Sequence, residues 1–463
     1  MYSTRDQLPS FFDEVEKISA AQLRTSLLPH QQRVVDRIKE QSGLVVAHPL
    51  GSGKTLTSIA ASIELAPDKT KVLVPAALQE NYRKELEKHV SGNHGIEVGS
   101  LQKYVADGKM PNSDILIVDE AHRARNPGQK TYQILAGADN KKRLMLTASP
   151  MYNRASDIAA VVNLASGSKT LPTGSEFNKK FVAEPAKGLW ALLPFFRKKP
   201  EIINKGQLKS VLNKWVDYEP PRSEGFPSVT SERVTLPMSD KQTKLHDAAW
   251  GRLGFISKLR LNAGLPPEKK DLSAINFFQS QARQVTGSLK NYGGDDEMPP
   301  KLRTATRDLT EDLGKNPRHK AVVYSNYLNN LQTYSDELAK RNVPHALFTG
   351  ALSAKRRNQA VTDYNNGKLK ALLVSSAGGE GLDLKGTRTV QVLEPHWNEE
   401  KLKQVIGRAV RYKSHEHLPK EEQTVHIKRY EAVPKGSKRG IEQTLFDMSS
   451  EKDALINQVK ALM

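Results

Sequence analysis

Residues 44–55 read LVVAHPLGSGKT, a short apolar run followed by a loop with two glycines and then by Lys54 and Thr55. The apolar run predicts a buried parallel strand, and the glycines let the loop fold back with its N–H groups pointing inward at a phosphate. Lys54 is placed to reach the β and γ phosphates of a nucleotide, and the Thr55 hydroxyl to hold Mg²⁺. The first loop position is His48 rather than glycine, and an ordinary strand-to-helix turn is the alternative.

Composition favours a basic protein of several domains. The chain has 463 residues, more than one ordinary hydrophobic core supports. It carries 70 Lys and Arg against 51 Asp and Glu, a formal net charge of +19, with a mean hydropathy of -0.56. Such an excess favours nucleic acid as a partner, because each neutralised phosphate releases condensed counterions. A basic surface that only maintains solubility is the alternative.

The absence of cysteine excludes disulfide bonds, cysteine-ligated zinc and thiol catalysis. The amino terminus lacks the basic-then-apolar order of a signal peptide. No apolar run approaches the roughly 18 residues that a membrane span needs. We therefore expect a cytoplasmic or nuclear protein, in the host cytoplasm if a phage encodes it.

Strands alternate with helices in the first half of the chain. Residues 10–40 predict helices, interrupted at LLPHQQ, where Gln31 is either a reader of adenine or a surface amide. Beyond the loop, apolar runs at 71–75, 114–118 and 143–147 predict strands. This alternation indicates a doubly wound parallel sheet, which binds ligands at the carboxyl ends of its strands.

The middle of the chain separates two such units. Residues 151–218 predict helices, and their basic stretch 197–214 is either a solvated helix face or a surface that tracks phosphates. Residues 218–227 are rich in proline and charge and predict a linker. A mostly helical region follows to about residue 290, and a surface loop is expected at 293–300.

The alternation then begins again without a second GKT. Strands are predicted at 321–324, 346–348, 369–375 and 389–393, and helices at 328–341 and 353–365. A terminal helix is expected to dock through one apolar stripe, which consists of Ile441, Leu445, Met448, Leu455, Val459 and Leu462. We therefore predict an α/β fold with two doubly wound parallel-sheet lobes, helical insertions and a C-terminal helix. The expected domains are 1–222 (nucleotide-binding lobe), 223–300 (linker and helical insertion) and 301–463 (second lobe).

An acidic pair supplies the chemistry that the nucleotide loop lacks. Hydrolysis of a phosphoanhydride needs a held metal ion, a positioned water and stabilisation of the charge on the γ-phosphoryl oxygens. Asp119 directly follows an apolar strand, where its carboxylate can reach the metal ion. Glu120 can orient or deprotonate the attacking water. Such acidic pairs also occur at helix starts, but the position after a buried strand favours the catalytic interpretation.

An arginine pair is the remaining catalytic candidate. Residues 404–415, QVIGRAVRYKSH, put Arg408 and Arg411 on the same face of a predicted helix. They are either a solvated helix face or, supplied by one lobe to a nucleotide on the other, stabilisers of the transition state. Hydrolysis would then depend on lobe closure, which can drive stepping along a strand. The preceding stretch 375–384, SSAGGEGLDL, is either a flexible loop or a phosphate contact, in which Asp383 could meet a ribose hydroxyl.

Taken in order, GSGKT, DEAH, LTASP, SSAGGEGLDL and QVIGRAVR resemble the motifs of superfamily 2 helicases and translocases, which have two RecA-like lobes. LLPHQ, HPLGSGKT and LEPHWN are most similar to the SWI/SNF-like branch of that superfamily. GRAVRYKSHEHLP resembles the versions carried by phages and large DNA viruses more than those of chromatin remodellers. The resemblance covers most of the chain and is weakest from about residue 240 to 300.

The resemblance implies ATP and Mg²⁺ as cofactors and a role for each motif residue. Catalysis is implied for Lys54, Asp119, Glu120, Arg408 and Arg411. Nucleotide contact is implied for Gln31, Leu50, Gly51, Ser52, Gly53, Lys54, Thr55, Gly381, Asp383 and Gln404, and metal contact for Thr55 and Asp119. Nucleic-acid contact is implied for Pro75, Ser100, Thr349, Ser375 and Ser376, and coupling of the two sites for His122, Thr147 and Ser149. Asp383 departs from the family, in which asparagine is frequent.

We therefore expect an ATP-dependent DNA translocase or helicase that acts as a monomer on duplex, forked or four-way-junction DNA. Its compact length favours branch migration or the remodelling of forks and recombination intermediates. The alternatives are a motor that displaces proteins or transcription complexes from DNA, an RNA helicase, and a nucleic-acid-binding scaffold with a vestigial ATP site.

Overall fold

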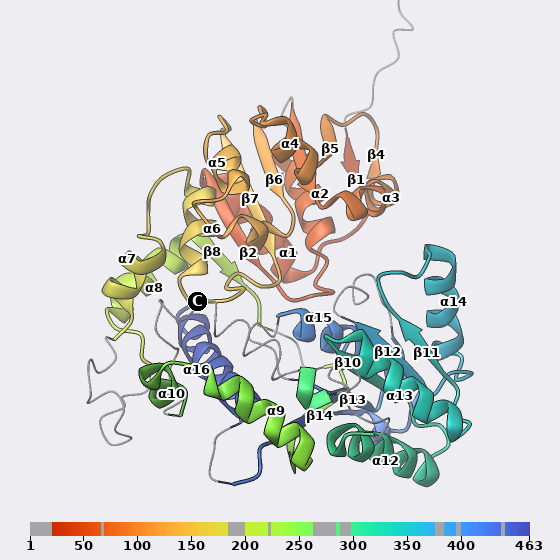
Figure 1. Ribbon diagram of the computed structural model, residues 1–463. Coiled ribbons are helices and arrows are strands. Elements are labelled where there is room, and N and C mark those ends of the chain that lie inside the picture. Colours follow the sequence, from red (N-terminus) through yellow and green to blue (C-terminus); the bar gives the residue numbers. More distant parts are fainter. Residues whose placement is uncertain are drawn as a thin grey trace, which may run out of the picture.

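The structure is a computed structural model. It describes residues 21–65, 69–183, 200–220, 224–262, 284–287, 298–375, 384–394, 400–436 and 440–463. Within these residues, two six-stranded sheets form two lobes, which lie one above the other in Figure 1. Every pair of neighbouring strands in both sheets is parallel. The predicted fold, two RecA-like α/β lobes, is confirmed.

The first sheet has the strand order β5-β3-β6-β7-β2-β8. Its strands are β2 (Gly43–Ala47), β3 (Thr70–Val74), β5 (Ile96–Ser100), β6 (Ile115–Val118), β7 (Lys142–Thr147) and β8 (Val216–Tyr218). The four central strands are the four that the apolar runs predicted. The two edge strands, β5 and β8, were not predicted from the sequence.

Helices cover both faces of this sheet because successive strand residues point to opposite sides. Leu44 and Val46 pack on the face covered by α1, α2 and α3, while Val45 and Ala47 pack on the face covered by α5, α6 and α8. The helices of the lobe are α1 (Pro29–Glu40), α2 (Lys54–Leu65), α3 (Gln79–His89), α4 (Leu101–Asp107), α5 (Lys130–Ala136), α6 (Asp157–Ser166), α7 (Gly174–Phe181) and α8 (Lys205–Trp215).

The beginning of the chain differs from the helical prediction for residues 10–40. Helix α1 forms the second half of this stretch. Pro29 is at its first helical position, where the backbone N–H that proline lacks would have no partner within the helix. Before it, β1 (Gln22–Leu23) pairs antiparallel with β4 (Val90–Ser91), so this part is extended rather than helical. Residues 10–20 lie outside the described residues.

The second sheet has the strand order β11-β12-β10-β13-β14-β9. Its strands are β9 (Ser228–Pro237), β10 (Ala321–Ser325), β11 (His345–Phe348), β12 (Ala371–Ser375), β13 (Thr389–Val392) and β14 (Thr424–Val433). Helices α12 (Pro300–Lys315) and α13 (Leu328–Lys340) cover one face, and α14 (Ala354–Asn365) and α15 (Glu400–Ala409) the other. Strands β9 and β14 were not predicted, and β9 lies in the stretch 223–300 that we expected to be linker and helix.

The terminal helix α16 (Ile441–Lys460) crosses from the second lobe to the first, as Figure 1 shows. At its start, Glu442 accepts a hydrogen bond from the fully buried Lys301 of α12 at 2.8 Å. Ile441 and Leu445 pack against α9 (Asp240–Gly251) and α10 (Phe255–Asn262). At its end, Ile456 and Val459 are part of the first lobe's core. The helix therefore holds the two lobes together.

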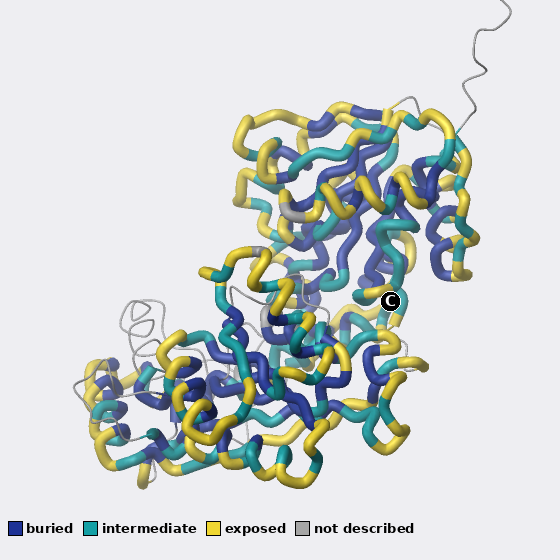
Figure 2. The backbone as a smooth tube through the Cα atoms, turned by 90° about the vertical axis from the view of Figure 1, so that its right-hand side faces the viewer, coloured by how far each residue is buried: buried dark blue, intermediate teal, exposed yellow. Residues whose placement is uncertain are grey.

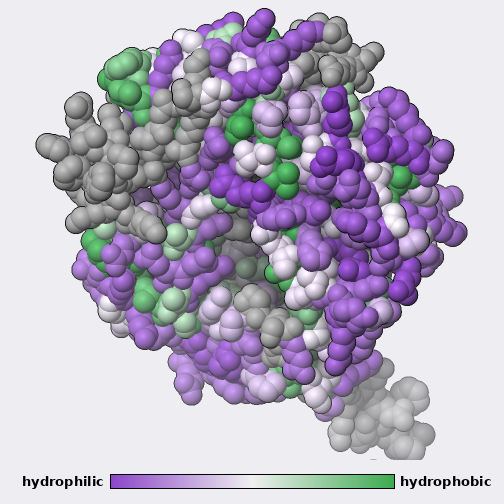
Figure 3. All heavy atoms as spheres, turned by 90° about the horizontal axis from the view of Figure 1, so that it is seen from below, coloured by the Kyte–Doolittle hydropathy of each residue, from purple (hydrophilic) through white to green (hydrophobic). Residues whose placement is uncertain are grey.

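The surface agrees with the charged composition. Figure 2 shows the strands of both lobes as buried segments surrounded by partly and fully exposed helices and loops. Seen from below, the molecule presents a mostly hydrophilic face on which apolar side chains form only small groups (Figure 3). Among the described helices, none combines the length and the apolar character that a membrane crossing requires.

A buried histidine makes the second lobe sensitive to acid. Burial lowers the pKa of His319 to about 4, although the charge of Asp312 opposes the shift. An unfolded chain takes up this proton near pH 6.5, so between about pH 6.5 and 4 the free energy of unfolding falls as pH falls. We expect the free energy of unfolding of His319→Gln to fall by up to about 3 kcal/mol less than that of the wild-type protein over this pH range. The measurement is the free energy of unfolding of both proteins from about pH 7 to 4.5. An acid response equal to that of the wild-type protein would contradict this assignment.

Candidate active site

The loop between β2 and α2 has the shape expected of a phosphate-binding loop. Gly51 and Gly53 both have φ of +79°, in the left-handed region that favours glycine. Lys54 begins α2, and its Nζ donates to the carbonyl oxygens of His48 and Pro49 at 3.0 Å each. Burial lowers the pKa of Lys54. A bound phosphate would therefore compete with two backbone oxygens for this ammonium group.

Helix α1 supports the loop from behind. Gln31 is only 2% exposed; its Nε2 donates to the Ser52 carbonyl oxygen at 3.2 Å, and its Oε1 accepts from the Leu28 N–H at 2.9 Å. His30 Nε2 lies 2.9 Å from the same Ser52 oxygen. A Cβ at Gly53 would come within 2.4 Å of Gln31 Nε2, so this position needs glycine. The Gln31 amide thus holds the loop in this conformation, and its contact with adenine stays a prediction.

A buried ionic cluster, which the sequence analysis missed, anchors the first loop position. His48 is fully buried, and its Nε2 lies 2.7 Å from Asp217 Oδ1 on β8. Arg33 donates to both oxygens of Asp217, and Arg37 Nη1 donates to Oδ2 at 3.0 Å. Burial alone would raise the pKa of Asp217, but hydrogen bonds from His48, Arg33 and Arg37 hold it well below its ordinary range. His48 and Asp217 are 169 positions apart, which explains why no local pattern linked them.

The acidic pair lies at the carboxyl end of β6. Asp119 Oδ1 accepts the N–H of Glu120 at 2.9 Å. Glu120 has φ of +51°, rare for this residue type, and its Oε2 lies 3.2 Å from His122 Nδ1. Burial raises the pKa of Asp119 to about 6, and the charge of Glu120 adds to the rise. Burial also raises the pKa of Glu120, but the hydrogen bond with His122 and nearby positive charges outweigh it, so this pKa lies below its ordinary value.

The donor set is suited to a magnesium ion. Asp119 offers a buried carboxylate whose raised pKa shows that its charge is poorly compensated, so a cation nearby would stabilise the charged form. Thr55, in the first turn of α2, offers a hydroxyl oxygen. Carboxylate and hydroxyl oxygens are the ligand types that Mg²⁺ prefers. The residues present therefore fit the metal that the sequence analysis expects.

The three predicted coupling residues lie in one chain of contacts. His122 Nδ1 lies 3.1 Å from Thr147 Oγ1, and that oxygen accepts the N–H of Ser149 at 3.0 Å. The His122 ring also stacks on Tyr152, with centroids 5.0 Å apart and planes within 7°, and the guanidinium of Arg125 lies over the Tyr152 ring, 4.3 Å from its centroid. The stack was not predicted because neither Tyr152 nor Arg125 belongs to a sequence motif.

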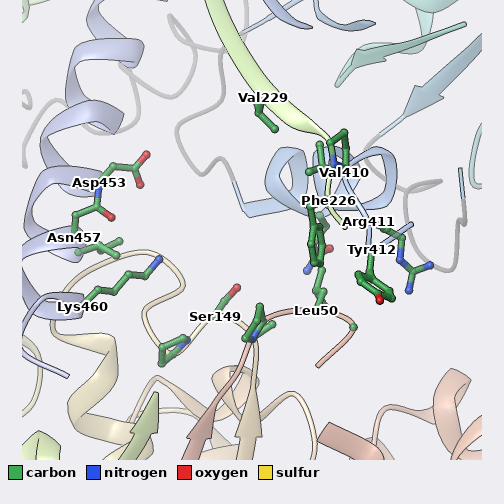
Figure 4. Close-up of a pocket in the computed structure, with 18 of the residues that line it drawn as sticks. Leu50, Ser149, Phe226, Val229, Val410, Arg411, Tyr412, Asp453, Asn457 and Lys460 are labelled. Carbon is green, nitrogen blue, oxygen red and sulfur yellow. The ribbon is translucent and has the colours of Figure 1, made fainter. Parts of the chain in front are cut away.

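A cavity of about 990 Å³ separates the nucleotide loop from the arginine motif. It is lined by residues of both lobes, of the segment that joins them and of α16: residues 49–51, 148–151, 226–229, 404, 407, 410–412, 453, 456, 457 and 460. Figure 4 shows Leu50 and Ser149 on the side of the first lobe. Arg411 and Tyr412 lie across the cavity from the last turns of α16. A Cβ at Gly407 would lie 3.4 Å from Leu50, so the two lobes approach closely here.

The arginine pair differs from the prediction of one shared helix face. Helix α15 ends at Ala409, so Arg408 is in the helix and Arg411 is in the turn that follows. Arg411 and Gln404 line the cavity, whereas Arg408 is not among its lining residues and uses its carbonyl oxygen to accept the Leu384 N–H at 3.4 Å. Beyond the helix, residues 412–417 form turns, with Lys413 at φ of +58°.

The predicted nucleic-acid contacts lie at the carboxyl ends of two strand pairs. Pro75 follows β3 and Ser100 ends the adjacent β5, while Thr349 follows β11 and Ser375 ends the adjacent β12. Ser100 also lines a hollow of about 520 Å³ with several basic and acidic side chains. Ser376, Gly381 and Asp383 lie outside the described residues. The roles of all these residues stay predictions.

Comparison with known families agrees with the two-lobed arrangement. The SNF2-related domain matches residues 98–288, and the helicase conserved C-terminal domain matches residues 304–413. The first match therefore includes the acidic pair and the coupling residues, and the second the arginine motif.

Individual relatives extend over nearly the whole chain. A putative ATP-dependent RNA helicase, L538, of Acanthamoeba polyphaga mimivirus is 30% identical over 94% of this chain and 96% of its own length. A termination factor NPH-I homolog of African swine fever virus is 23% identical over 91% of this chain and 75% of its length. A DNA repair and recombination protein RAD54-like of Drosophila willistoni is 23% identical over 84% of this chain and 59% of its length.

Among solved structures, the Sulfolobus solfataricus SWI2/SNF2 ATPase core in complex with dsDNA is similar over 95% of each chain, with 17% identity and a TM-score of 0.39. The mimivirus relative and the two domain matches decide the family. The chain belongs to the SNF2-like branch of superfamily 2, the ATP-hydrolysing helicases and translocases.

Proposed function

We propose that the protein is an ATP-dependent translocase or helicase that moves along DNA and remodels forked or branched duplexes. One observation carries the proposal: a single cavity is lined by the nucleotide loop and the coupling residue Ser149 of one lobe and by the arginine motif of the other. Hydrolysis at such a site depends on closing the lobes, and cycles of closing and opening can move the protein along a strand.

Each catalytic group has a defined task in this proposal. Lys54 leaves the carbonyl oxygens of its own loop and binds the β and γ phosphates. Thr55 and Asp119 would hold Mg²⁺, which when bound neutralises charge on the phosphate oxygens. Glu120, charged at neutral pH, accepts a proton from the attacking water. Arg411 stabilises the charge that develops in the transition state.

The coupling chain gives the catalytic site a connection to the grip on nucleic acid. His122 is within 3.2 Å of Glu120 and within 3.1 Å of Thr147, and Thr147 in turn holds the backbone of Ser149 at the cavity wall. If Glu120 moves when ATP is hydrolysed, the direct contacts through His122 and Thr147 can therefore shift Ser149 at the interlobe surface.

Three observations support a nucleic acid as the track, and the third favours DNA. The net charge of +19 favours a polyanion. The four described residues proposed to contact the strand lie at the carboxyl ends of neighbouring strands, two in each lobe. One relative is named for DNA repair and recombination, although the mimivirus relative is named an RNA helicase. RNA is therefore the competing substrate.

A second candidate function is a motor that displaces transcription complexes from DNA. It is supported by the similarity to a termination factor NPH-I homolog, which covers 91% of this chain. Both functions use the same ATP site and differ in the substrate that stimulates it.

The test is the rate of ATP hydrolysis with no nucleic acid, linear duplex, single-stranded DNA, a four-way junction and RNA, all at one salt concentration because phosphate contacts depend on salt. Lys54→Ala is the control that should not hydrolyse ATP with any of them but should keep binding DNA. Strongest stimulation by the junction supports the proposed function.

Other outcomes separate the alternatives. Equal stimulation by linear duplex and junction favours the displacement motor, and strongest stimulation by RNA favours an RNA helicase. No stimulation by any nucleic acid would exclude a nucleic-acid motor altogether.

A further inference from the structure

The segment that joins the two lobes touches the arginine motif directly beside Arg411. Gly225 and Phe226 precede β9, the first strand of the second lobe. The Lys413 N–H donates to the Gly225 carbonyl oxygen at 2.7 Å. The rings of Phe226 and Tyr412 have centroids 5.9 Å apart at an angle of 54°. Figure 4 shows Phe226, Tyr412 and Arg411 together on one side of the cavity.

The fit between this segment and Tyr412 leaves no room for a side chain. Gly225 has φ of +74°, and a Cβ at this position would lie 2.4 Å from Tyr412 Cε2 and 2.8 Å from Cδ2. Lys413 has φ of +58°, a conformation that is strained for a residue with a side chain and persists only where its surroundings impose it. The contact with Gly225 is one such constraint.

The opposite side of the turn is fixed to the body of the second lobe. Ser414 is buried; its Oγ donates to the Arg411 carbonyl oxygen at 2.8 Å, and its own carbonyl oxygen accepts the Gly386 N–H at 2.8 Å. His415 Nε2 lies 2.7 Å from the Thr387 carbonyl oxygen. Arg411 therefore stands in a turn that is held on one side by the residues preceding β13 and on the other by the interlobe segment.

Tyr412 contributes little to the hydrophobic core. It is 57% exposed and lines the cavity together with Phe226 and Arg411. Burial of a ring that is more than half exposed stabilises the fold only weakly. Its close contact with Gly225 therefore needs an explanation other than fold stability.

The same interlobe segment is anchored at its other end beneath the nucleotide loop. Asp217, on the last strand of the first lobe, bonds His48 of that loop. Further along the chain, Gly225 contacts Tyr412 and Lys413 of the arginine motif. The segment thus touches both halves of the site that the nucleotide would join.

We propose that Tyr412, seated on Gly225 and Phe226, is a positioning residue that sets the place of Arg411 in the cavity, so that the interlobe segment controls hydrolysis. The inference rests on the proposed function, since it needs Arg411 to act on ATP. Displacing a catalytic group by about 1 Å costs on the order of 10²-fold in rate. A shift of the segment when the lobes open is therefore sufficient to switch hydrolysis off without releasing ATP.

The experiment compares Tyr412→Ala, Gly225→Ala and the conservative Tyr412→Phe with the wild-type protein at saturating nucleic acid. We expect kcat to fall about 10-fold to 10²-fold in the first two variants, with KM for ATP nearly unchanged. The thermal unfolding midpoint should stay nearly unchanged in Tyr412→Ala, whereas Gly225→Ala puts a side chain at φ of +74° and should lower it. Tyr412→Phe keeps the ring and should keep kcat. A fall in the unfolding midpoint of Tyr412→Ala that parallels its fall in kcat, or a Tyr412→Phe variant as slow as Tyr412→Ala, would overturn the proposal.

A second comparison tests whether Tyr412 acts through Arg411. Residues that act as a unit have non-additive effects, so in an Arg411→Ala background the Tyr412→Ala change should lower the single-turnover rate no further. An equal loss in both backgrounds would overturn the proposal, as would unchanged kcat in Tyr412→Ala. If instead the wild-type protein shows no nucleic-acid-stimulated hydrolysis, the proposed function fails, and this inference fails with it.

Discussion

Replacing Arg411 with alanine should lower the rate of ATP hydrolysis by about 10³-fold to 10⁵-fold while ATP remains bound. Arg411 belongs to the second lobe, yet it lines the same cavity as Leu50 and Gly51 of the nucleotide loop. In the proposed mechanism the loop and Lys54 bind the phosphates without Arg411, whereas the charge that develops on the γ-phosphoryl oxygens needs a second cation. The measurement is kcat in the presence of DNA, together with the Kd for ATP.

Arg356→Ala is the matched control, because Arg356 is an exposed arginine of the same lobe on α14, away from the cavity. It should hydrolyse ATP at the wild-type rate. If Arg411→Ala also hydrolysed ATP normally, the nucleotide would not be shared between the lobes. A large loss in Arg408→Ala alone would assign the catalytic role to Arg408, which the sequence analysis expected to act together with Arg411.

Local patterns in the sequence predicted the four central strands of the first sheet and β10 to β13 of the second, and they missed β5, β8, β9 and β14. Strands β2, β6 and β10 are fully buried, and a continuous apolar run is the signal of such strands. The edge strand β9 is mostly exposed and reads SVTSERVTLP, which has no apolar run. Its neighbour β14 contains Glu431, which is 1% exposed and paired with Arg233 of β9. That compensation connects residues far apart in the sequence, so no local pattern reveals it.

In the site, too, the features set by neighbouring residues could be predicted, and the contacts between residues far apart in the sequence could not. The residues of the nucleotide loop and the acidic pair lie in short motifs whose geometry depends on neighbouring residues, and they are where the sequence placed them. Asp217, Tyr152 and the contact of Gly225 with Tyr412 join separate motifs, and nothing in their immediate sequence reveals them. Spacing alone also misplaced Arg411 on a helix, because it does not show where α15 ends.

Replacing Glu120 with glutamine should lower kcat by about 10²-fold to 10⁴-fold, the range of a lost general base. The pKa of Glu120 lies below its ordinary value, so the side chain is charged at neutral pH and can accept a proton. Glutamine keeps the shape and the position beside His122 but cannot act as a base. ATP should bind as before, since Lys54 and the loop are unchanged. Glu80→Gln, at an exposed carboxylate on α3, is the control that should keep full activity.

The two slow variants should differ in how the lobes respond to ATP. Glu120→Gln retains Arg411, so bound ATP can still draw the second lobe onto the first, whereas Arg411→Ala has lost that contact. Differential contact with the two states is what allows a ligand to shift their populations. ATP should therefore change the DNA affinity of Glu120→Gln more than that of Arg411→Ala, measured at one salt concentration. Equal responses would mean that Arg411 acts only in the chemical step, while an unchanged kcat in Glu120→Gln would remove Glu120 from the mechanism.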